Sequence, residues 1–186
     1  MENEQIKIIR SSRKTLAVQV RGTGLIVRAP YDTDTRQIRE FLQKHQRWID
    51  RHLQKAKYAD ETAQHEGMLT NEDIQKLADQ AKAVIPGRVS YFAFLMGVSY
   101  GRITIRCQRS RWGSCTSKGN LNFNCLLMLA PPEVLDSVVV HELAHRKEMN
   151  HSDRFYRVIR EVYPDYNIWN QWLKKNGRIL LRRIEQ

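Results

Sequence analysis

The chain lacks the cysteine patterns that staple small secreted domains or hold structural zinc. Its three cysteines, Cys107, Cys115 and Cys125, are odd in number and include no Cys-x-x-Cys pair, which argues against a disulfide framework and against a cysteine zinc site. The chain also lacks a run of 18 apolar residues, and residues 1–7 do not read as the start of a signal peptide. We therefore expect a reduced cytoplasmic protein without a membrane partner.

Acidic residues are outnumbered. Lys and Arg total 31 against 20 Asp and Glu, which gives a formal net charge of +11, and such an excess favours polyanionic partners such as nucleotides or nucleic acid. The basic residues are spread along the sequence, with concentrations at 102–111 and 174–183, and an ordinary solvated surface explains such a spread as well. The charge leaves a nucleotide or nucleic-acid partner open without requiring one.

The pattern of apolar and polar residues in the first third of the 186-residue chain predicts a small lobe. Apolar and polar residues alternate over residues 5–30, which indicates a β-hairpin. Apolar residues then recur at helical spacing over 38–53, where His45 and His52 fall on the apolar stripe and are interpreted as packing or surface residues outside the metal site. We expect residues 1–60 to form an N-terminal lobe of a β-hairpin followed by one amphipathic helix.

The rest of the chain predicts a larger domain at 70–186, after a polar, aperiodic linker at 58–69. Two alternating segments, 102–106 and 121–125, indicate a short antiparallel hairpin. Helical spacing of apolar residues predicts helices at 70–96, where Pro86 kinks or divides the helix, and at 133–149, 153–162 and 168–177. The predicted fold class is therefore α+β.

Residues 141–151 read His-Glu-Leu-Ala-His-Arg-Lys-Glu-Met-Asn-His. Four residues apart on a helix, His141 and His145 lie on one face and can aim at the same point, which makes half of a metal site. Glu142 lies about 100° around the helix, where its carboxylate can act as general base on a metal-bound water. A catalytic zinc takes three protein ligands and leaves one position open, so a third donor must follow.

The third ligand has more than one candidate. His151 has the spacing of the pattern His-Glu-x-x-His-x-x-Gly-x-x-His, but Glu148 occupies the glycine position. We therefore expect the helix to continue to about residue 149 and the chain to turn at Asn150. Glu161 and Asp165 on the following segment are alternatives, since zinc accepts carboxylate as well as imidazole. One zinc ion is expected, although imidazole also suits other divalent transition metals.

Short segments along nearly the whole chain match one known pattern. They are Arg28-Ala-Pro30, Trp48-Ile49, Arg111-Trp-Gly-Ser-Cys115, Asn120-Leu-Asn-Phe-Asn124, Pro131-Pro132, His141-Glu-Leu-Ala-His145 and Asn150-His-Ser152. Together they resemble the YgjP-like metallopeptidase family, a group of bacterial metal-dependent hydrolases. The resemblance implies a zincin-like helical catalytic lobe, related in plan to SprT-like and WLM proteases. It also implies a zinc ion held by His141, His145 and His151, with Glu142 as the catalytic base.

Hydrolysis is the reaction that such a site predicts. Zinc polarises a carbonyl or phosphoryl oxygen, and Glu142 takes the proton of the metal-bound water. A developing oxyanion needs a further donor, and Arg111, Asn124 and Tyr156 are the candidates because their segments are expected near the metal helix.

The sequence leaves three hypotheses open for the substrate class. The resemblance favours a zinc metallopeptidase acting on a peptide or protein. A nucleotide or phosphoanhydride hydrolase is an alternative, in which Arg106, Arg109 and Arg111 would clamp phosphates. A nucleic-acid-binding module with a structural metal is a second alternative, although structural zinc sites are normally closed by four ligands.

Overall fold

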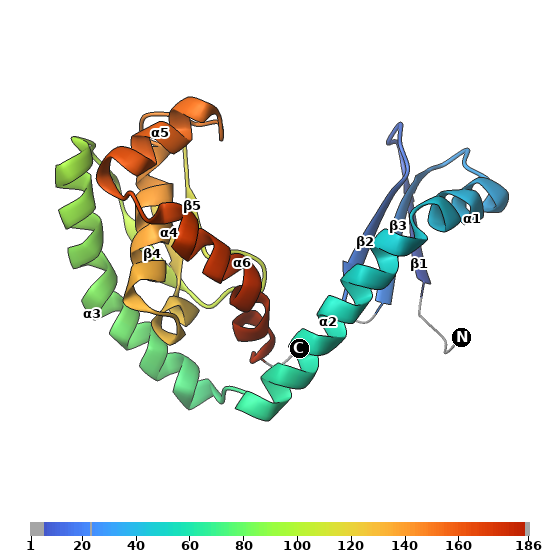
Figure 1. Cartoon of the computed structure of the whole chain (residues 1–186), viewed down its shortest axis with the longest axis horizontal. Helices are drawn as coiled ribbons and strands as arrows, with labels where there is room; N and C mark the ends of the chain where they lie inside the picture. Colours follow the sequence, from blue (N-terminus) through green and yellow to red (C-terminus); the bar gives the residue numbers. More distant parts are fainter. Residues whose placement is uncertain (1–5, 23, 185–186) are drawn as a thin grey trace. The chain divides into compact units, whose positions relative to one another are not determined.

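The computed structural model describes residues 6–22 and 24–184 and divides the chain into two compact units, Met1–Glu66 and Gly67–Gln186 (Figure 1). Residue Gln5, at the start of the predicted hairpin, lies outside the described residues. Within those residues the units hold six α-helices and two three-stranded sheets, so the α+β prediction is confirmed. No helix in the described ranges is both long enough and apolar enough to cross a membrane.

The first unit is built on a three-stranded sheet. Strands β2 (Ala17–Arg21) and β3 (Gly24–Pro30) form the predicted antiparallel hairpin. Strand β1 (Ile6–Ser11) pairs in parallel with β3, which the alternation pattern alone did not indicate. The buried side chains of β3 alternate along the strand at Leu25, Val27 and Ala29, as expected for a sheet with one covered face.

The predicted single helix over 38–53 is wrong, because the chain forms α1 (Thr35–Lys44) and α2 (Gln46–Glu66). His45 stands between them: its backbone N–H donates to Phe41 O and Leu42 O, while its ring Nδ1 lies 2.8 Å from Phe41 O. The predicted linker at 58–69 is also wrong up to Glu66. Helix α2 continues there because Ala56, Ala59 and Ala63 form a buried stripe at helical spacing.

Helix α3 (Asn71–Met96) opens the second unit with a capping box between Thr70 and Asp73. The helix is continuous through Pro86, so the proline does not divide it. Ile85 and Val89 on either side of the proline are fully buried in the main core, and this packing offsets the loss of one backbone hydrogen bond. Gly97 ends the helix in the left-handed conformation.

The second sheet has the order β4-β6-β5, formed by β4 (Ile103–Arg106), β5 (Gly113–Cys115) and β6 (Leu121–Asn124). The antiparallel hairpin exists, but its strands are β5 and β6. The predicted pairing of 102–106 with 121–125 is therefore wrong in sense, because β4 runs parallel to β6. Strand β5 was missed because a three-residue Gly-Ser-Cys segment carries no alternation signal.

Helix α4 (Pro132–Ala144) lies inside the second unit, in contact with α3, α5 (Asp153–Val162), α6 (Tyr166–Arg182), β5 and the short helix η1 (Cys125–Leu129). Most of its residues are buried, including the polar Ser137 and Glu142, so the helix packs against neighbours on most of its sides. Helix α6 continues past Gly177, where we expected it to end. That glycine faces Trp112, since a Cβ there would lie 3.0 Å from the indole Nε1.

Candidate active site

The end of α4 sets the positions of the histidines. The helix ends at Ala144, not near residue 149 as expected, and His145 is its C-cap. The chain then turns through backbone bonds from Arg146 N to Leu143 O and from Glu148 N to Ala144 O. No non-glycine residue in the described ranges has a positive φ, so the turn needs neither a glycine in place of Glu148 nor a left-handed Asn150.

Three histidines converge after this turn. The candidate ligand atoms of His141, His145 and His151 all lie within 4.8 Å of one another, and the Nε2 atoms of His141 and His151 are 3.1 Å apart. The fully buried Phe155 of α5 packs against all three imidazoles, with ring centroids 4.7 to 5.0 Å away. Glu161 and Asp165, the alternative third ligands, are exposed and outside this group.

The donor set fits a transition metal. His145 Nδ1 lies 3.3 Å from the carbonyl oxygen of Glu148, which can only accept, so Nδ1 donates and Nε2 keeps a free lone pair. His141 Nδ1 lies 2.8 Å from the hydroxyl of Tyr166, a contact that orients the ring. Metal-binding imidazoles are commonly oriented by such partners of the other ring nitrogen.

Burial favours the neutral imidazoles that a metal requires. Desolvation, with the neighbouring His145 and His151, lowers the pKa of His141 to about 4. Desolvation also lowers the pKa of His145. Neutral rings keep the lone pairs that a divalent cation needs, so the cluster is suited to a cation at neutral pH.

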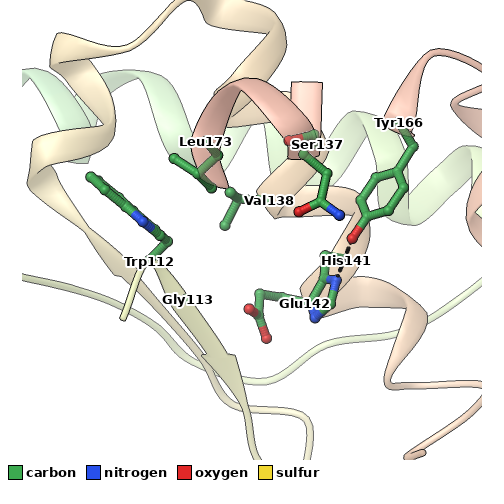
Figure 2. Close-up of a pocket in the computed structure, with 9 residues that line it drawn as sticks. Trp112, Gly113, Ser137, Val138, His141, Glu142, Tyr166 and Leu173 are labelled. Carbon is green, nitrogen blue, oxygen red and sulfur yellow. Dashed lines mark hydrogen bonds between the residues drawn. The ribbon is translucent and has the colours of Figure 1, made fainter. Parts of the chain in front are cut away.

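Glu142 lies in a tight space beside β5, next to His141 (Figure 2). Glu142 is 6% exposed, and a Cβ placed on Gly113 would lie 2.5 Å from Glu142 Oε1. Burial raises the pKa of Glu142 to about 8, and the charge of Arg111 acts in the opposite direction. The lack of a side chain at Gly113 is thus what makes room for this carboxyl group.

A pocket of about 190 Å³ opens beside Glu142 and His141 (Figure 2). Helix α6 contributes Tyr166, Asn170 and Leu173, which are spaced by about one turn, and Gly113 of β5 contributes together with Trp112, which precedes the strand. The remaining lining residues, Ser137 and Val138, come from α4, as do His141 and Glu142. The space adjoins the candidate base and one candidate ligand at once.

The predicted oxyanion donors have different surroundings. Asn124 is 1% exposed, and its amide donates to Gln108 O and Arg111 O, so both N–H groups serve the loop and we do not retain it as a donor. The ring of Tyr156 lies 6.5 Å from that of His151, and Arg111 is exposed but close enough to act on Glu142. These two stay candidates.

Other predicted residues are outside the site. His45 and His52 pack on Phe41 and Trp48 in the first unit, as interpreted. All three cysteines are free thiols. Sequence reasoning missed Tyr166, whose contact with His141 joins residues 25 apart and leaves no spacing signal.

A family comparison identifies the chain. The YgjP-like family, described as YgjP-like, metallopeptidase domain, matches residues 14–76 and 71–176. The chain belongs to this family. As a YgjP-like protein it is a metal-dependent peptidase, a hydrolase that acts on peptides or proteins.

Two solved metallopeptidase zymogens are similar to about half of this chain. The metallopeptidase zymogen of Pyrococcus abyssi abylysin is 19% identical, with a TM-score of 0.46 over 51% of this chain and 97% of that one. The zymogen of Methanocaldococcus jannaschii jannalysin is 18% identical, with a TM-score of 0.45 over 50% and 96%. No curated protein matches the chain.

Proposed function

We propose that this YgjP-like protein is a zinc peptidase in which His141, His145 and His151 hold the metal and Glu142 is the general base. The observation that carries the proposal is the convergence of three oriented imidazoles beside a buried carboxyl group. Three imidazoles suit zinc and leave a coordination position open. When bound there, the metal would polarise the scissile carbonyl and acidify water.

The protein groups have separate roles in the proposed reaction. Glu142 accepts a proton from the attacking water and returns it to the leaving amine, a task for which a pKa raised toward neutrality is suited. Tyr166 fixes the ring of His141 through the 2.8 Å contact to Nδ1. Arg111 and Tyr156 are the donors that we propose for the developing oxyanion.

The pocket favours peptides over phosphates as substrates. Arg106 and Arg109 are exposed and do not line the pocket, which leaves Arg111, close enough to act on Glu142, as the one arginine of the predicted clamp near the site. A phosphate clamp needs such side chains aimed at the reacting group. We therefore propose no nucleotide hydrolysis.

Metal content and casein cleavage test the ligands and the base. Wild-type protein is expected to carry one zinc ion per chain by elemental analysis and to cleave unstructured casein. His141→Ala should lose the metal, while His52→Ala, a histidine of the first unit, should keep it. Glu142→Gln should keep the metal and lose cleavage, while Glu161→Gln, an exposed acid of α5, should keep both. Full activity of Glu142→Gln would reject the role of the base.

We also propose that the catalytic domain spans residues 70–186 and that the N-terminal lobe at 1–60 is a separate domain. The division of the chain at Glu66 and Gly67 supports this proposal. A fragment of residues 67–186 should keep helical circular dichroism and bind one metal ion. An unfolded fragment would contradict the division.

A further inference from the structure

The pocket beside Glu142 has an apolar and aromatic wall formed by Trp112, Val138, Tyr166 and Leu173, and no lysine or arginine lines it. Figure 2 shows Trp112 and Tyr166 on opposite sides, with Leu173 and Val138 between them. The indole of Trp112 is seated against α6, where Gly177 has no side chain to displace it. The walls are therefore formed by rigid groups that favour contact with another ring.

The volume suits one ring. An apolar cavity of about 150 Å³ is sufficient to bind benzene, and this pocket measures about 190 Å³. An alanine side chain would leave most of that space unfilled and forfeit its dispersion contacts. A phenyl or phenol ring is the side chain that this space accommodates.

The residues that line the pocket disfavour an ionised side chain of a substrate. No lysine or arginine lines the pocket, so an acidic guest would have no counter-ion. A basic side chain of a substrate would form an ion pair with Glu142, which the proposed reaction needs as its general base. The amide of Asn170, which forms no hydrogen bond within the described residues, can bond to a phenol hydroxyl.

We infer that this pocket binds a phenylalanine or tyrosine side chain of the substrate, next to the bond that is cleaved. The inference rests on the proposed peptidase function, because Glu142 and His141 line the same pocket. Leu173 and Trp112 are then residues that determine specificity. They act by fitting the guest ring and take no part in proton transfer.

Matched peptides test the preference. Quenched fluorescent peptides that carry a single Phe, Tyr, Ala or Glu in a Gly/Ser background are incubated with the zinc-loaded full-length protein, and mass spectrometry locates the cuts. We expect cleavage beside Phe or Tyr with kcat/KM about 10- to 100-fold above the Ala peptide. Equal kcat/KM for the Phe and Ala peptides would overturn the inference and leave the peptidase function intact.

A pocket-filling variant tests the residues. Leu173→Trp should bring the ratio of kcat/KM for the Phe and Ala peptides close to one, because the new indole occupies the space for the ring. Ile168→Trp, which adds the same group on the exposed side of α6, should keep the wild-type ratio. An unchanged ratio in Leu173→Trp would also overturn the inference.

Binding without turnover separates the two hypotheses. Saturation-transfer NMR on metal-free protein should detect N-acetyl-phenylalanine amide but not N-acetyl-alanine amide, and Leu173→Trp should abolish the signal. If no peptide is cleaved but this binding is seen, the proposed function fails and the pocket assignment stands. Equal signals from wild type and Leu173→Trp would remove the pocket assignment.

Discussion

Replacing Gly113 by alanine should disable Glu142 without touching the candidate metal ligands. A Cβ on Gly113 would lie 2.5 Å from Glu142 Oε1 and 2.7 Å from Cγ, whereas ordinary contact begins at 3.4 Å. The carboxyl group must therefore retreat by about 0.9 Å. Because Glu142 is 6% exposed and closely packed, it has little space in which to retreat and keep its orientation.

The magnitude follows from the displacement. A misplacement of about 1 Å in a reacting group costs about 100-fold in rate, so Gly113→Ala should lower kcat/KM on a casein peptide by about that factor. Zinc per chain should stay at the wild-type value, because the three histidines lie outside β5. The two measurements together separate a misplaced base from a lost metal.

Gly101 offers a matched control. A Cβ there would approach Asn120 Oδ1 to the same 2.5 Å, but both residues are exposed and neither lines the pocket. Gly101→Ala should therefore cost stability and leave kcat/KM near the wild-type value. Our reasoning is refuted if Gly113→Ala keeps wild-type kcat/KM, or if Gly101→Ala loses as much.

Three further predictions concern the metal, pH and the thiols. Tyr166→Phe removes the partner of His141 Nδ1 and should weaken zinc binding about 10- to 100-fold in a chelator competition; unchanged affinity would reject the orienting role. In the folded metal-free chain, burial raises the pKa of Glu142 from its ordinary value of 4.5 to about 8. The stability of this chain should therefore fall as pH rises from about 4.5 to 8, and thermal melts of Glu142→Gln should lack this slope. Cys107 is exposed, whereas burial raises the pKa of Cys125 to about 12, so mass spectrometry should find iodoacetamide on Cys107 first; equal labelling rates would contradict this burial.

The fold could be predicted where the signal is local. The β2–β3 hairpin and the cap of α3 follow from alternation and from residues within one turn. The parallel pairings of β1 with β3 and of β4 with β6 could not, because they join segments that are far apart in the chain. The break between α1 and α2 at His45 was also hidden, since the apolar spacing continues across it.

The same distinction between local and long-range signals applies to the residues of the candidate site. The spacing of His141, Glu142 and His145 depends on a single helix, so one sequence suffices to place them on it. Tyr166 and Gly113 come from other elements, and their contacts with the helix depend on tertiary packing. A glycine that must stay small beside a carboxyl group has no sequence signature of its own.

His151 shows why the glycine of the longer pattern is dispensable here. A glycine serves where the backbone needs a positive φ, and this turn has none. The guanidinium of Arg146 donates to Ser99 O and Ser117 O, which anchors the turn at its start. The cap that Ser152 places on α5, with Phe155 buried beneath the imidazoles, fixes its end. Side-chain anchors at both ends of the turn therefore bring His151 to the cluster, a task that backbone freedom at one position would otherwise perform.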